Sequence, residues 1–254
     1  MVRFEAKTER LEKLARVFPE RIEELEKIFK DSTNVYLDYA NIQNWSEKLR
    51  WHVDIKRLKQ FFDSFSTIQF VRLYSGTLKE NQNSLHFIKE AEVLDYEVTT
   101  KEVKKMRLSL DVSGIPKNSP VILENFIKKT LLRQFTLETI EYLNSKLKES
   151  NERGIRFVEH WKCNFDVEIS CDMILDGERK SVQTFILWSG DGDFSSSVER
   201  LMRDSEKKVF LFATARRVSP ELHETGVPIF DIQKIRNFIC RADEIEEEVK
   251  KQIV

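Results

Sequence analysis

Residues 184–194 read TFILWSGDGDF, and the predicted sheet is built around them. Its first five residues are almost continuously apolar, which is typical of a strand buried on both faces of a parallel sheet. The chain then turns at Ser189 and places Asp191 and Asp193 close together. Two such carboxylates repel each other, whereas hard divalent cations such as Mg²⁺ take oxygen ligands of this kind. The stretch therefore predicts metal-dependent phosphate chemistry at one edge of a sheet.

The composition favours a globular protein with a sizeable core. The chain has 254 residues, of which 41% are hydrophobic and 18 are Phe. The 42 basic and 43 acidic residues nearly cancel, so a nucleic-acid partner would have to be held by a local basic patch. Three cysteines without CxxC spacing indicate reduced thiols and a cytoplasmic protein. Neither a signal peptide nor an apolar run of membrane-spanning length is expected.

Strand and helix patterns alternate along most of the chain, which predicts an α/β fold with a mainly parallel central sheet and right-handed crossovers. Strands are expected at 34–38, 67–74, 96–103, 155–158, 184–188, 208–213 and 227–230. Helices are expected at 53–65, 84–94, 166–175 and 195–204, with a short one opened by Ser219 and Pro220.

The two ends of the chain are expected to be helical. Residues 1–32 form an N-terminal flank of amphipathic helices, split at Pro19 because proline is tolerated only in the first turn of a helix. Residues 241–254 read as an acidic and then basic C-terminal helix that is solvated. The domain between them is predicted to span 33–240.

An insertion at about 105–153 interrupts the alternation. It contains a loop at 111–118 and then a helical stretch, opened by Ser119 as cap with Pro120 at the first helical position. The apolar residues of this stretch span a broader face than one packing surface needs. We therefore expect the insertion to thicken the core, to clamp substrate or to form a dimer.

Four acids are expected to meet at the carboxyl edge of the sheet, where open parallel sheets bind their ligands. Asp38 ends the first strand, Asp166 begins a helix, and Asp191 and Asp193 follow the central strand. Such a group predicts one or two Mg²⁺ or Mn²⁺ sites, because the four histidines are scattered and no Cys or His pair has zinc spacing. The expected chemistry is in-line hydrolysis of a phosphodiester.

Structural roles remain open for several of these residues. Asp38 could cap a turn, and Asp166 could be an ordinary helix N-cap. Asp172 lies about 120° around the same helix from Asp166, so it fits a supporting or solvent-facing role as well as ligation. Asn41 could orient a ligand or hold the turn after Asp38.

Three motifs in this order resemble the NYN domain, in the LabA-like branch of the PIN-like nuclease superfamily. The resemblance covers about 33–104 and 155–240, and the chain departs from the family at Cys163, where a glycine is usual, and in the helical insertion. The motifs are VYLDYAN with Asp38 and Asn41, KCNFDVEISCDMIL with Lys162, Asp166 and Asp172, and LWSGDGDF with Ser189, Asp191 and Asp193.

The resemblance implies a Rossmann-like PIN fold and Mg²⁺- or Mn²⁺-dependent cleavage of RNA, with an endoribonuclease as the expected enzyme. Metal-binding and catalytic roles are expected for the four acids. Substrate-binding roles are expected for Asn41, Lys162, Ser189 and Ser195. RNA is the expected partner, and a homodimer through the insertion or the terminal helices is a second expectation.

Three other functions could be assigned to these residues. A dinucleotide loop fails because 190–195 lacks the last glycine and its carboxylates would repel a pyrophosphate. A haloacid-dehalogenase-like phosphatase needs a second acid where Ala40 stands. A non-catalytic RNA- or protein-binding scaffold is disfavoured because all four acids are present. Basic residues that could hold phosphates are Lys101, Lys104, Lys105, Arg107, Lys128, Lys129, Arg133, Arg216 and Arg217.

Overall fold

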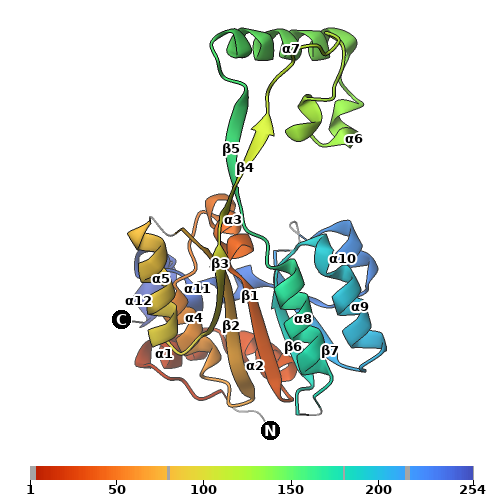
Figure 1. Cartoon of the computed structure of the whole chain (residues 1–254). Coiled ribbons are helices and arrows are strands. Elements are labelled where there is room, and N and C mark those ends of the chain that lie inside the picture. The colour runs from red at the N-terminus through yellow and green to blue at the C-terminus, as the bar shows by residue number, and fades with distance from the viewer. Residues whose placement is uncertain (1–3, 79–80, 180, 215–217, 254) are drawn as a thin grey trace. The chain divides into compact units, whose positions relative to one another are not determined.

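The structure is a computed structural model that describes residues 4–78, 81–179, 181–214 and 218–253. The chain divides into two compact units (Figure 1). The first joins Met1–Glu102 with Asn164–Val254, and the second is Val103–Cys163. The inserted unit thus begins and ends at 103 and 163, where the sequence predicts about 105 and 153. Within the described residues, no helix combines the length and apolarity needed to cross a membrane.

A parallel sheet forms the centre of the first unit. Among the described residues it has six strands in the order β3-β2-β1-β6-β7-β8, so the chain starts in the middle and winds toward each edge in turn. The predicted α/β class with a mainly parallel sheet is confirmed. The strands are β1 (Thr33–Asp38), β2 (Ile68–Thr77), β3 (Glu97–Glu102), β6 (Thr184–Trp188), β7 (Lys208–Ala213) and β8 (Ile229–Asp231).

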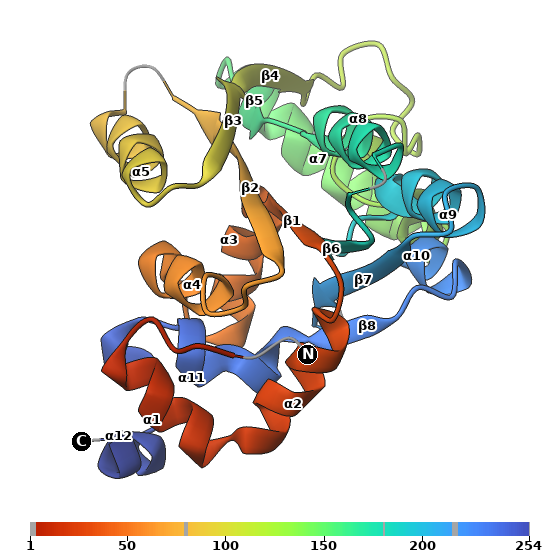
Figure 2. The same cartoon turned by 90° about the horizontal axis from the view of Figure 1, so that it is seen from below.

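Helices cover both faces of this sheet (Figure 2). One face carries α1 (Glu9–Val17), α2 (Pro19–Ile28), α4 (Ile55–Phe62) and α11 (Arg236–Ile239). The other carries α8 (Asp166–Gly177) and α9 (Ser195–Arg203). Because β1 and β6 lie between two helical layers, every residue of both strands is buried. The apolar run at 184–188 is explained by this position.

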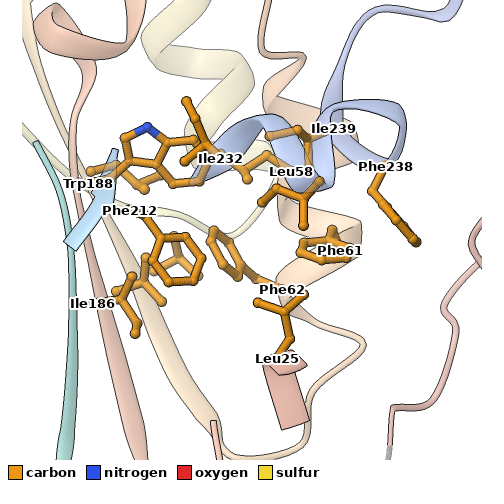
Figure 3. Close-up of a cluster of buried hydrophobic side chains, with 14 of the residues drawn as sticks. Leu25, Leu58, Phe61, Phe62, Ile186, Trp188, Phe212, Ile232, Phe238 and Ile239 are labelled. Atoms are coloured by element: carbon orange, nitrogen blue, oxygen red, sulfur yellow. The ribbon is translucent and has the colours of Figure 1, made fainter. Parts of the chain in front are cut away.

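The main core lies between the sheet and the α4 side of the first unit. Phe61 and Phe62 of α4 are buried there with Trp188 and Phe212 of the sheet (Figure 3). Asp54 caps α4 by accepting a hydrogen bond from the backbone nitrogen of Arg57 at 3.0 Å. Burying each large apolar side chain stabilises the fold by about 1.5–3 kcal/mol, so this cluster holds the sheet that carries the acids.

The remaining elements of the first unit bring two corrections. The predicted solvated tail is wrong, because Val249 of α12 (Glu247–Ile253) and Ile245, just before that helix, are buried in the core. A helix directly after the first strand, α3 (Tyr39–Leu49), was not predicted. The other elements, α5 (Gln82–Val93) and α10 (Pro220–Glu224), lie where the sequence places them.

A buried charge network fixes α8 on the sheet. The carboxylate of Asp176 accepts a hydrogen bond from the Tyr36 hydroxyl at 2.7 Å and pairs with Arg72 Nη1 at 2.8 Å. One turn earlier, Asp172 accepts a hydrogen bond from the Tyr74 hydroxyl at 2.6 Å. Asp172 therefore supports the helix that begins at Asp166, which is one of the roles the sequence leaves open.

The second unit contains an antiparallel ribbon and a small helical cluster. Strands β4 (Lys104–Ser109) and β5 (Phe157–Lys162) form the ribbon. The prediction that 155–158 resumes the alternating sheet is wrong, because Phe157 and Val158 pair with β4 and β5 is exposed throughout. A strand without a long apolar run cannot be buried on both faces.

The helical stretch predicted to begin at Ser119 also differs from the structure. The structure has η1 (Leu123–Asn125), α6 (Lys129–Leu132) and α7 (Leu137–Glu152) in its place. The Asn144 amide donates to the Ser119 carbonyl at 2.8 Å, so that carbonyl is held by a side chain of α7. Thr136 is the residue that caps α7. Leu123, Leu132 and Ile140 form the core of this cluster.

Candidate active site

Asp38 and the loop after β6 lie at the same edge of the sheet. Strand β1 pairs in parallel with β6, with Leu37 opposite Trp188. The next residues, Asp38 and Ser189, therefore leave their strands together at the carboxyl end. This is the edge at which parallel sheets bind ligands.

The hydroxyl of Ser189 joins the first and third motifs. It donates to Asp38 Oδ2 at 3.2 Å, and it accepts from Asn41 Nδ2 at 3.0 Å and from the Asp191 backbone nitrogen at 3.3 Å. The Asn41 amide also donates to Asp38. Ser189 is fully buried, and its hydroxyl holds Asp38, Asn41 and the Asp191 backbone in place.

Asp191 and Asp193 are exposed to solvent in the loop after β6. The Asp191 carboxylate accepts a hydrogen bond from the Asp193 backbone nitrogen at 3.2 Å and so caps the 3-10 turn Gly192–Phe194. A Cβ atom at Gly192 would lie 2.9 Å from Ser219 Oγ, so a glycine lets this loop approach α10 closely. The capping bond uses one oxygen of Asp191 and leaves the other for a ligand.

Asp166 is the first residue of α8 and does not cap it, because Phe165 occupies the N-cap position without a side-chain bond. The carboxyl is half-buried, and burial raises its pKa. The charges of Asp191, Asp38 and Asp193 raise the pKa of Asp166 further, while a hydrogen bond with Asn164 lowers it. The four carboxylates therefore share one electrostatic environment.

Asp38 is the buried member of this group of four carboxylates. Burial is the main cause of its raised pKa, and the charge of Asp191 adds to it. Hydrogen bonds from Asn41 and Ser189 act in the opposite direction, since they stabilise the ionised carboxylate. Asp38 also caps α3 by accepting from the Asn41 backbone nitrogen at 3.4 Å, so the capping role and a ligand role coexist.

Among the causes that shift the pKa values of Asp38 and Asp166 most, the charged groups of the described residues are the neighbouring aspartates, and these raise both pKa values. Within the same residues, no three or more His, Cys, Asp or Glu side chains are placed so that they could hold a metal ion. The donor type and the mutual repulsion of these carboxylates fit a divalent cation, and binding one would require side-chain rearrangement.

The other predicted site residues are not all brought together. Ser195 begins α9, directly after the acidic loop. Lys162 is exposed at the end of β5 and belongs to the second unit. Lys101 pairs with Glu168 at 2.7 Å, so it is not an isolated phosphate contact. Arg216 and Arg217 lie outside the described residues.

Asn164, which hydrogen-bonds Asp166, is a residue that sequence reasoning missed. Its place two residues before Asp166, inside the second motif, was the signal that could have identified it.

The raised pKa values predict how stability depends on pH in the absence of metal. Between the ordinary aspartate pKa of 3.8 and the raised pKa of Asp166, the folded protein binds more protons than the unfolded chain. The free energy of unfolding should therefore fall as pH rises through this window. Melting temperatures measured in chelator from about pH 4 to about pH 7 should fall less for Asp166→Asn than for the wild type. Parallel curves would contradict the shared environment of the four acids.

A comparison with protein families matches the part of the chain that holds the second and third motifs. The family model of the NYN domain matches residues 125–226, a range that contains Asp166, Asp191 and Asp193 but not Asp38. Among solved structures, a protein of unknown function from Vibrio parahaemolyticus is similar, with a TM-score of 0.48 and 18% sequence identity. That similarity covers 83% of this chain and 96% of the other. No curated protein matches the chain.

Proposed function

We propose that this chain, which carries an NYN domain of the PIN-like superfamily, is a metal-dependent ribonuclease that hydrolyses RNA phosphodiester bonds. The observation that supports the proposal most is the shared environment of four carboxylates at the ligand-binding edge of the sheet, where the neighbouring aspartates raise the pKa values of Asp38 and Asp166. Endonucleolytic cleavage, the LabA-like branch and a cytoplasmic location stay predictions.

Asp38, Asp166, Asp191 and Asp193 are the residues that would hold Mg²⁺ or Mn²⁺. Such an ion, when bound, activates water and stabilises negative charge on the reacting phosphate oxygens. The chain itself contributes the placement of the acids: Ser189 and Asn41 hold the Asp38 carboxylate, and Asn164 contacts Asp166. Because the Asp38 oxygens are already oriented by hydrogen bonds, less side-chain freedom is lost when a ligand binds.

Substrate contacts are proposed for Ser195 and Lys162, with Asn41 beside Asp38. Ser195 is half-buried at the first position of α9. Lys162 supplies an exposed positive charge that suits an RNA phosphate. Ser189 is assigned a positioning role because its hydroxyl is buried and already bonded to Asp38, Asn41 and Asp191.

The proposal predicts strict dependence on a divalent metal. Purified full-length protein incubated with mixed cellular RNA should cleave it with Mg²⁺ or Mn²⁺ and leave it intact with chelator, because the acids alone cannot neutralise phosphate charge. Gel electrophoresis of the products measures this, and restoring metal to the chelated sample is the control. Equal cleavage in chelator would overturn the metal-dependent mechanism.

The rival function is a non-catalytic scaffold that binds RNA or a protein. It is favoured by one observation, that no three-residue metal group is preformed within the described part of the chain. A scaffold would bind RNA and yield no product with either metal. The phosphatase interpretation receives no support from the comparisons, and Ala40 leaves its motif incomplete.

A homodimer remains a separate proposal. Exposed apolar side chains on the helices and turns of the second unit would be its contact surface, and sedimentation velocity would test it. These side chains are Val121, Phe126, Leu131 and Leu137.

A further inference from the structure

The β4–β5 ribbon presents aromatic and cationic side chains on one face. Residues directly opposite each other on an antiparallel pair share a face, and alternate positions along a strand do so too. Lys105 lies opposite Trp161, Arg107 opposite Glu159 and Ser109 opposite Phe157. This face, here called the ribbon face, therefore consists of Lys105, Arg107, Ser109, Phe157, Glu159 and Trp161.

Two aromatic rings of the ribbon face are open to solvent. Trp161 is 53% exposed and Phe157 is 43% exposed. Lys105 Nζ lies 5.4 Å from the Trp161 ring centre, and Arg107 Cζ lies 4.4 Å from that of Phe157. Neither aromatic belongs to the apolar core of its unit, which is built from Leu123, Leu132 and Ile140. Packing inside the unit therefore does not account for them.

The ribbon also carries a local excess of positive charge. Its two strands contain four cations, Lys104, Lys105, Arg107 and Lys162, and one carboxylate, Glu159. Lys105 and Arg107 of the ribbon face pair with Glu159, whereas Lys104 and Lys162 lie opposite each other on the other face. The whole chain, by contrast, has a formal net charge of −1. One carboxylate cannot neutralise four cations, so the ribbon suits a polyanion.

We infer that the ribbon face binds single-stranded RNA, with bases stacked on Trp161 and Phe157 and phosphates paired with Lys105 and Arg107. Exposed aromatic rings beside cations are the features that single-stranded nucleic acid recognises, whereas bases in a duplex are already stacked and unavailable. The two rings lie four residues apart on β5, about 13 Å, so they take two separate bases. This inference deepens the proposed function, on which it rests for the identity of the polymer.

The test measures binding without cleavage. Fluorescence anisotropy in chelator reports the affinity of the full chain for a labelled, unstructured single-stranded RNA of about 20 nucleotides, longer than one binding site. Trp161→Ala should weaken binding about tenfold, and Trp161→Tyr should keep most of the affinity, since a base still finds a ring. Arg107→Gln should reduce the dependence of log affinity on log salt by about 0.7.

A matched control is available in the same unit. Tyr142 on α7 is 62% exposed with Lys146 Nζ 5.8 Å from its ring centre, so it has a similar ring and cation outside the ribbon. Tyr142→Ala should bind RNA as the wild type does. Circular dichroism of each variant checks that the unit stays folded.

Three outcomes would overturn the inference. The first is unchanged RNA affinity in Trp161→Ala, which would leave the rings as stabilisers of the ribbon itself. The second is binding of duplex RNA as tight as that of single-stranded RNA, which would indicate that the ribbon recognises phosphate charge without base stacking. The third is dimerisation that Trp161→Ala abolishes in sedimentation velocity, which would make the ribbon an interface between copies. Ribbon-dependent binding without cleavage in any metal would instead refute the proposed function and leave the ribbon assignment standing.

Discussion

Asp191→Asn should reduce RNA cleavage by about 100-fold or more while the protein stays folded. The substitution keeps the size of the side chain and removes a charge that the nearby acids experience, since Asp191 raises the pKa of both Asp38 and Asp166. An asparagine oxygen can still accept the 3.2 Å hydrogen bond from the Asp193 backbone nitrogen, so the turn cap survives. The measurement is the initial rate of RNA cleavage with Mg²⁺ or Mn²⁺.

The same variant tests whether Asp191 has a purely structural role. Relief of repulsion predicts that the melting temperature of Asp191→Asn in chelator equals or exceeds that of the wild type. Asp204→Asn is a matched control, because Asp204 is exposed at the end of α9, away from the acidic loop. It should cleave RNA normally. A large drop in the melting temperature of Asp191→Asn would show that the carboxylate holds the fold.

Arg72→Met should destabilise the fold by about 3 kcal/mol, because it removes the better buried of the two arginine partners of Asp176 and leaves that carboxylate with Arg179 Nη1 at 3.0 Å. Asp176 is almost completely buried, and Arg72 Nη1 lies 2.8 Å from its carboxylate. Arg72 also pairs with Glu97 at 2.8 Å. Methionine keeps the apolar part of the arginine side chain, so the decrease in the free energy of unfolding measures the contribution of the guanidinium charge. Urea unfolding monitored by tryptophan fluorescence measures it.

An exposed pair supplies the comparison for Arg72. Arg203 pairs with Glu199 one turn away on α9, and both side chains are exposed. Arg203→Met should cost less than about 1 kcal/mol, as surface ion pairs usually do. Equal losses for the two variants would mean that the Asp176 network does not hold α8 on the sheet. Asp166 begins that helix, so Arg72→Met should also lower cleavage at temperatures where the protein is folded.

The elements predicted best from sequence are those with a strong local pattern. The apolar run at 184–188 identifies a doubly buried strand, and Pro19 marks the break between α1 and α2. Local pattern also places Asp38 and Asp191 at strand ends. The rules for parallel sheets predict that these two acids lie at the same edge, and the pairing of β1 with β6 brings them there.

Long-range contacts account for what sequence reasoning missed. Arg72 occupies a polar position in an alternating strand and looks solvated, yet it meets a carboxylate from α8. Ile245 and Val249 are too sparse to mark a buried helix, although α12 packs on the core. The pattern of Phe157–Lys162 resembles a sheet strand, but its partner is β4. In each case the deciding partner is distant in the chain.

Binding of Mn²⁺ to the purified protein, measured by titration calorimetry without RNA, tests whether the gathered carboxylates hold a cation. We expect saturable binding to the wild type, at least tenfold weaker binding to Asp191→Asn and Asp166→Asn, and wild-type binding to Asp204→Asn. Absence of Mn²⁺ binding by the wild type, or equal binding by all four proteins, would contradict the claim that these carboxylates are gathered to hold a cation.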